Sequence, residues 1–354
     1  MAVYLINIAL IFFWSSLLLK DKREDKKKKK AFCIIVAVQW ILISGLRHKS
    51  VGADTNAYGV AFENVKNMSW DKVLTNCWDY LFEGLEIKDP GYNLLVKFFQ
   101  VFFESYQVFL IFIAVVFTCL MARWIYRNSE LPEISFLVYS VLFYAFYAVT
   151  GHRQTLATAL VFFLGYELIK KKKFIRFAII AFMAFMIHKS SIVFVLYLLI
   201  AHKSIGWIYS AIMLIVSVAL AVLGKSIYVP IAGELGFGEG VIDYAGGGAE
   251  TYSTVLLLLC VVIIGCYPWI SRRRKDVKFL YNLIYLTVAS TLFVYQNQSF
   301  MRVQQYFSMI IMIMIPEVIL TFREKNRTIG YLAVVGVLVT YLAIQNPQYK
   351  FFFM

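Results

Sequence analysis

The chain is built mainly from apolar blocks, each about 16 to 22 residues long, that follow one another with short polar linkers. An α-helix rises about 1.5 Å per residue, so such a block matches the roughly 30 Å of hydrocarbon in a bilayer. Apolar residues make up 61% of the chain and charged residues 16%, which excludes a soluble globular domain of this length. Alternating strand patterns are absent, and backbone in lipid must satisfy its own hydrogen bonds. The sequence therefore predicts an all-α integral membrane protein, a polytopic helical bundle.

Hydropathy predicts about twelve spans in one polytopic membrane domain that covers residues 1–354. We expect these spans at 2–19, 31–46, 105–126, 133–149, 154–169, 174–187, 190–201, 205–223, 252–270, 279–295, 303–320 and 328–344.

Basic residues are concentrated in alternate linkers, most densely in 20–30, 170–173 and 271–278. If the N-terminus lies outside, these linkers and most of the 35 lysines and arginines face the cytoplasm. The positive-inside rule favours this orientation and places both termini outside. Topology therefore explains the net charge of +14, and no nucleic-acid partner is expected.

Two long linkers, 47–104 and 224–250, fall on the outer side. In the first, "GYNLLVKFFQVFFESY" predicts an amphipathic helix in the outer membrane interface. Its polar face would carry Asn93, Lys97, Gln100 and Glu104. The second linker contains glycines that match no nucleotide-binding fingerprint, so we expect a mobile loop.

Ionisable and amide side chains gather at the predicted outer ends of the spans. A charged group there costs several kcal/mol unless it is paired or faces water, so it marks a cavity or a substrate path. The alternative for each residue is a polar turn or a long side chain that reaches the surface. The residues are Arg47, His48, Asp54, Arg153, Gln154, His188, Lys189 and Arg302.

Several arginines that converge on one outer cavity fit a phosphate or diphosphate group, because a guanidinium bonds phosphate oxygens in pairs. Asp54 or His188 would then take a proton from an attacking hydroxyl, and the sequence does not choose between them. Gly52 permits a tight turn that would bring Asp54 back toward Arg47. No motif for zinc hydrolysis or nucleotide binding is present, so we expect no metal and no soluble cofactor.

Three segments resemble the EpsG family of Wzy-like polysaccharide polymerases. "GLRHKSVGADTNAY" at 45–58 is similar to the family's Arg-x3-4-Gly-x-Asp-x3-Tyr signature. "GHRQTLATALVFFLGYELIKKKKFIRF" at 151–177 and "FMAFMIHKSSIVFV" at 182–195 follow in the same order, so the resemblance covers roughly residues 40 to 200. His48 departs from the pattern, because the family often has an aromatic residue there.

The resemblance implies a GT-C-like membrane glycosyltransferase in the bacterial cytoplasmic membrane. It would join undecaprenyl-diphosphate-linked oligosaccharide repeat units at the outer face, for exopolysaccharide, capsule or O-antigen synthesis. The partners implied are membrane lipid, the lipid-linked oligosaccharide, and a flippase and chain-length regulator of the same pathway. The residues expected to be catalytic are Asp54, His188 and Arg153, and those expected to bind substrate are Arg47, Tyr58, Gln154, Ser190 and Arg302.

Three other functions remain open at this stage. A polytopic O-acyltransferase would need a donor that enters from the cytoplasm, whereas the polar cluster is expected outside. A flippase or transporter would carry charged residues at mid-membrane and show hydropathy symmetry. A non-catalytic subunit of a synthesis complex is the third.

Overall fold

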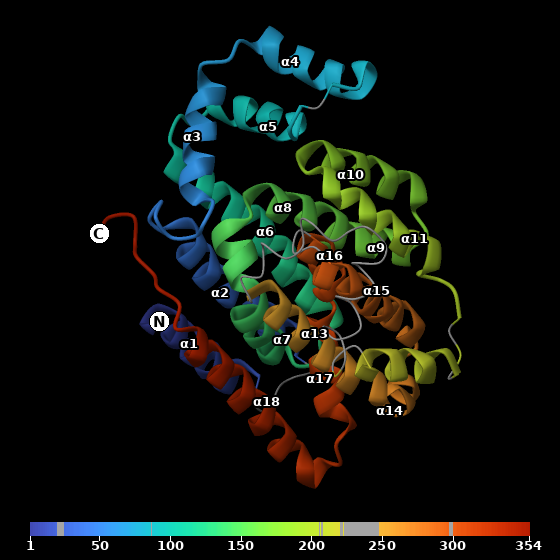
Figure 1. Ribbon diagram of the computed structural model, residues 1–354. Coiled ribbons are helices and arrows are strands. Elements are labelled where there is room, and N and C mark those ends of the chain that lie inside the picture. Colours follow the sequence, from blue (N-terminus) through green and yellow to red (C-terminus); the bar gives the residue numbers. More distant parts are fainter. Residues whose placement is uncertain are drawn as a thin grey trace. The chain divides into compact units, whose positions relative to one another are not determined.

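Figure 1 shows a computed structural model of the protein. It describes residues 1–354 apart from 20–24, 86, 205, 207, 220–221, 223–247 and 297–299. Within these described ranges the regular elements are helices, and one isolated bridge joins Arg47 to Phe351. The all-α prediction is confirmed. The outer loop predicted at 224–250 lies outside the described residues up to position 247.

The chain forms two compact units, one of residues Met1–Ile192 with Tyr331–Met354 and one of Val193–Gly330. The first unit contains ten α-helices that lie wholly within its described residues, together with π-helical turns labelled η1 to η4. They are α1 (Ala2–Leu18), α2 (Lys26–Gly45), α3 (Thr55–Lys66), α4 (Trp70–Trp78), η1 (Asp79–Glu83), α5 (Pro90–Gln100), α6 (Tyr106–Asn128), α7 (Pro132–Val138), η2 (Tyr139–Phe143), η3 (Ala145–Thr150), α8 (His152–Thr158), η4 (Ala159–Leu164), α9 (Gly165–Lys170) and α10 (Phe174–Ile187).

The second unit is also helical in its described part. The 3-10 helix η5 (Lys189–Phe194) leads into it, and α18 (Glu324–Gln345) leads back to the first unit. Between them lie α11 (Val195–Ile200), a helix at Ile208–Ala219, α13 (Gly248–Gly265), α14 (Tyr267–Arg273), α15 (Val277–Gln296), α16 (Met301–Ser308) and α17 (Ile311–Thr321). The expectation of one membrane domain stays a prediction.

Among the described residues, two single helices are long and apolar enough to cross a membrane, α6 and α18. Two bent pairs raise this number to four if each pair is one span, α13 with α14 at 64° and α16 with α17 at 50°. Several other predicted spans correspond to apolar helices that are shorter or divided. The count of about twelve therefore stays a prediction.

Many apolar side chains lie on the outside of these helices. On α10, Ile175 is 81% exposed, Ile179 58% and Phe182 52%, and the most apolar stretch of α18 is only 11% buried. Such a surface is unfavourable in water and suits contact with lipid chains. The outward apolar faces support a membrane protein.

The helices differ from the sequence expectation in two places. The helix that contains the span expected at 31–46 begins at Lys26, because Asp25 accepts the backbone N–H groups of Lys27 and Lys28 and so caps a helix that starts among the lysines. Hydropathy does not detect such a start, since lysine is polar and yet a good helix former. The linker 47–104 contains three α-helices, α3, α4 and α5, where one interfacial helix was expected.

The amphipathic helix itself is confirmed as α5, but its polar face packs against protein. Lys97 donates to the Lys66 carbonyl at 3.0 Å, and Gln100 donates to the Phe62 carbonyl at 2.7 Å. Both acceptors belong to the last turns of α3. On the apolar side of α5, Val96 and Phe99 are buried and Phe98 is 58% exposed, so this side is only partly open.

The segment around Arg47 is fixed by the end of a π-helical turn. The widened helix η3 ends at Thr150, and helix ends leave carbonyls without an intrahelical partner. Ser44 donates to the Ala148 carbonyl at 2.7 Å, and Thr55 donates to the Val149 carbonyl at 2.9 Å. These bonds hold the residues on both sides of Arg47 against η3.

The C-terminal segment covers the same place. Phe352 donates its N–H to the Leu46 carbonyl at 2.9 Å, and His48 donates to the Lys350 carbonyl at 2.9 Å. The N-terminal amine of Met1 donates to the Pro347 carbonyl. Both termini therefore lie at the end of the first unit that holds Arg47 (Figure 1).

Gly52 makes the turn between α2 and α3 possible. Its φ is +100°, and an added Cβ would lie 2.6 Å from the Val149 carbonyl oxygen. We expect Gly52→Ala to lower the apparent thermal midpoint of the purified protein, because it adds both backbone strain and a clash. Gly84→Ala is the matched control, because Gly84 has φ +68° and nothing within 4 Å. Equal midpoints for the two variants would contradict the tight fit at Gly52.

Candidate functional site

A buried carboxylate connects three helices at one end of the first unit. Asp89 precedes Pro90 at the start of α5, has φ 49°, and its side chain is 3% exposed. Its Oδ2 accepts from Arg153 Nη1 at 2.8 Å and from His188 Nδ1 at 3.1 Å. Its Oδ1 accepts from the backbone N–H of Lys189 at 3.1 Å. The carboxylate thus joins the starts of α5 and α8 to the end of α10.

The surroundings of Asp89 keep it ionised. Burial raises the pKa of this carboxyl group, but the hydrogen bond from His188, the charges of His188 and Arg153, and the N–H of Lys189 together lower it. The net pKa lies below the ordinary value of 3.8. Asp89 is therefore an anion at neutral pH, and its carboxylate accepts from both Arg153 and His188.

His188 is oriented by this carboxylate. It follows α10 in extended backbone, with φ −157° and ψ 109°, so its ring turns away from the helix axis. An ionised carboxylate only accepts hydrogen bonds, so Nδ1 of His188 carries the hydrogen. Within the described residues, Nε2 is buried and has no hydrogen-bond partner. The ring therefore presents an unsatisfied nitrogen that can accept a proton.

Arg153 is the second residue of α8, and this helix begins directly after Gly151 and the π-helical turn η3. Besides the ion pair with Asp89, its Nε donates to the Tyr58 hydroxyl at 3.3 Å. The guanidinium lies 5.2 Å from the ring centre of Tyr58 and 5.9 Å from that of Tyr92. Its side chain remains 18% exposed, so the charge is positioned and still partly accessible.

Arg47 has a different environment, since it is 2% exposed. It donates to the Ser44 carbonyl, and its Nη2 donates to Nε2 of His152 at 2.8 Å. A guanidinium cannot accept a hydrogen bond, so His152 accepts through Nε2 and is neutral. Tyr58 stacks on the His152 ring with centres 4.3 Å apart. Through Tyr58, the Arg47–His152 pair is continuous with Arg153.

Four of the sequence-predicted residues thus lie in one cluster: Arg47, Tyr58, Arg153 and His188. Asp54 does not join them, because it is exposed at the start of α3 and forms no ion pair with Arg47. The turn at Gly52 is confirmed. The expected approach of Asp54 to Arg47 is not found, since the Arg47 guanidinium donates to His152 instead.

Three further predicted residues are Gln154, next to Arg153 in sequence, Ser190, two residues after His188, and Arg302. Gln154 is 2% exposed within α8, and Ser190 is half-buried in η5. Arg302 is exposed on α16 and belongs to the second unit.

Asp89 and His152 are not among the residues that the sequence indicates. The signal for Asp89 was present in "KDPGYN", where an aspartate stands directly before a helix-starting proline. No group of three or more His, Cys, Asp or Glu in the described part of the chain is placed to hold a metal ion.

The model of the EpsG family matches residues 30–353. The chain belongs to the EpsG family. The match includes every member of the Asp89 cluster and extends through the second unit. No curated protein and no solved structure matches the chain. EpsG membership and the outward apolar helices indicate an exopolysaccharide-related membrane protein of the polymerase type.

Asp89→Asn should destabilise the EpsG protein, because it leaves the Arg153 charge without its anionic partner. We expect a loss of about 1–3 kcal/mol, seen as a lower thermal midpoint in detergent. Asp71→Asn is the control, since Asp71 is exposed in the first turn of α4. If the two variants have the same midpoint, the Asp89 ion pair does not hold these helices together.

Proposed function

We propose that this EpsG protein polymerises oligosaccharide repeat units carried on undecaprenyl diphosphate, at the outer face of the bacterial cytoplasmic membrane. The observation that carries the proposal is the buried Asp89 carboxylate, which orients His188 and Arg153 side by side. A proton acceptor beside a cation is what glycosyl transfer from a diphosphate requires.

In this proposal His188 is the general base. Its Nδ1 is held by Asp89, and its unsatisfied Nε2 takes the proton of the acceptor hydroxyl. The geometry favours His188 over Asp54 for this role, because the exposed carboxylate of Asp54 has no side-chain partner among the described residues to orient it. Asp89 acts as a positioning residue for the imidazole.

Arg153 would bind the diphosphate of the donor. Its guanidinium is partly accessible and is held by Asp89, Tyr58 and Tyr92, so little side-chain freedom is lost on binding. Arg47 would act indirectly, because it is buried and fixes the neutral His152. Gln154, Ser190 and Arg302 remain proposed substrate contacts.

The proposed step forms one bond and breaks one bond. The acceptor hydroxyl oxygen attacks the anomeric carbon, and the bond between that carbon and the phosphate oxygen breaks. Undecaprenyl diphosphate leaves with the electron pair, and the cation of Arg153 stabilises its growing charge. The hydroxyl proton passes to Nε2 of His188 and then to water. The sugar–diphosphate bond supplies the energy.

Twelve spans, a GT-C-like bundle and termini on the outer side complete the proposal. The termini and the 45–58 segment share one end of the first unit, which agrees with a common side of the membrane. A flippase that supplies the lipid-linked units and a chain-length regulator are the proposed partners.

His188→Gln tests the base in a strain whose own copy of the gene is deleted. We expect polymerisation to fall by about 10²- to 10⁴-fold, so that long polymer disappears and single lipid-linked units accumulate on the outer leaflet. The readouts are polymer length on gels and mass spectrometry of extracted lipids. His48→Gln is the matched control, since His48 bonds only Ser50 among the described side chains.

Two results would contradict this assignment. Asp54→Asn that loses polymer while His188→Gln retains it would make Asp54 the base. Deletion that traps single units on the inner leaflet would identify a flippase.

Arg153→Lys tests the guanidinium separately from its charge. Lysine keeps the cation but cannot reach the Asp89 carboxylate and the Tyr58 hydroxyl at once, so we expect loss of long polymer although the protein still inserts. Lys97→Arg is the control for exchange of the two cations. Normal polymer length in the Arg153→Lys variant would show that the planar guanidinium group is dispensable.

A further inference from the structure

A second concentration of charge lies at the other end of α6. The first residue of this helix, Tyr106, donates to the Thr55 carbonyl at 2.7 Å, on the side of the Asp89 cluster. Arg123 follows 17 residues later, which is about 25 Å along the helix axis. The two ends are therefore separated by most of a membrane thickness.

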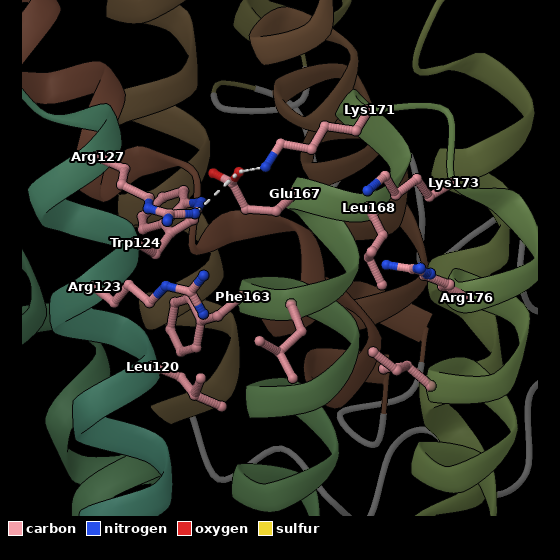
Figure 2. A pocket seen from close by; sticks show the side chains of 12 residues that line it. Leu120, Arg123, Trp124, Arg127, Phe163, Glu167, Leu168, Lys171, Lys173 and Arg176 are labelled. Carbon is pink, nitrogen blue, oxygen red and sulfur yellow. Dashed lines mark ion pairs between the residues drawn. The ribbon is translucent and has the colours of Figure 1, made fainter.

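At this end α6, α9 and α10 enclose a cavity of about 260 Å³ (Figure 2). Its lining contains one carboxylate, Glu167, and several apolar side chains such as Trp124 and Phe163. Five cationic side chains line the same cavity: Arg123, Arg127, Lys171, Lys173 and Arg176. We name these five the cationic cavity residues.

Glu167 balances only part of this charge. It lies 3.6 Å from Arg127 and 3.7 Å from Lys171. Arg123, Lys173 and Arg176 form no ion pair with any described residue. Figure 2 shows Arg123 and Arg176 extending from α6 and α10 toward the helix between them. The cavity therefore carries a positive charge that the described protein does not neutralise.

The start of α10 adds to the same field. The helix has 14 residues, and its N-cap residue Lys173 makes no side-chain cap bond. The first N–H groups of a helix have no intrahelical partner, and the helix dipole makes this end positive. Arg176 in the first turn adds another positive charge, which the positive end of the helix repels. A bound anion would offset this electrostatic repulsion and accept hydrogen bonds from the free N–H groups.

An apolar groove continues from the two arginines of α6. A cavity of about 510 Å³ is lined by Arg123 and Arg127 together with apolar residues of α2. Of these, Ile34 is 53% exposed and Val38 48%. A ligand with an anionic head and an apolar chain would fit both hollows at once.

We propose that the cationic cavity binds the phosphate of an anionic phospholipid and that the groove between α2 and α6 takes one of its acyl chains. The guanidinium groups of Arg123 and Arg176 would bond the phosphate oxygens, and basic pockets between membrane helices are suited to such head groups. The positive-inside rule accounts for many lysines and arginines here, but not for their convergence on a hollow at an uncapped helix start. This inference does not depend on the proposed polymerase.

The test uses the full chain in detergent and native mass spectrometry with three probes: dioleoyl phosphatidylglycerol, dioleoyl phosphatidylcholine and soluble glycerol 3-phosphate. We expect phosphatidylglycerol to bind at least tenfold more tightly than either other probe. The double variant Arg123→Gln/Arg176→Gln should lose this preference. Arg272→Gln/Lys275→Gln removes the same charge from another basic run and should keep it.

Equal retention of phosphatidylglycerol by the two double variants would overturn the proposal. Glycerol 3-phosphate that binds as tightly as the lipid would also overturn it, in favour of a soluble phosphate ligand. Elution volume and thermal midpoint in detergent micelles check the folding of each variant. If Arg123→Gln/Arg176→Gln does not fold, Arg176→Lys is tested in its place. This variant should weaken phosphatidylglycerol binding, because the lysine ammonium cannot bond two phosphate oxygens as a guanidinium does.

Discussion

One buried carboxylate organises the candidate site of this EpsG protein. Asp89 loses much of its hydration on burial, and that cost is recovered only because Arg153, His188 and the Lys189 N–H all bond to it. The same arrangement fixes the imidazole tautomer and holds the guanidinium against two tyrosine rings. The packing of these helices and the proposed base therefore depend on one set of contacts, and a change at Asp89 is expected to act on both.

The two arginines of the signature segments, Arg47 and Arg153, have different environments in the structure. Arg153 is accessible enough to contact a ligand, whereas Arg47 is buried and donates hydrogen bonds to Ser44 and His152. His152 in turn stacks on Tyr58, which touches Arg153. A buried arginine can thus be essential in such a site without reaching substrate, since it sets the position of the accessible one.

Sequence periodicity and charge were enough to predict the helical class, the basic linkers and the cluster members Arg153 and His188. The aspartate before Pro90 indicates a helix start at Asp89, but nothing local indicates that this turn will meet the end of α10, about 100 residues further along the chain. Asp54 was favoured by a motif position, but burial and partners are properties of the folded chain. The π-helical turns that widen η3 and expose carbonyls to Ser44 and Thr55 also leave no trace in hydropathy.

The pairing of Arg47 with Phe351 has a consequence for biogenesis. Tyr349 donates to the Ile43 carbonyl across 306 positions of sequence, so the first and last thirds of the chain meet only late in translation. Until then the carbonyl of Leu46 and the N–H of His48 lack their native partners. The early helices of the nascent protein would therefore form while this end of the first unit still lacks its native hydrogen-bond partners.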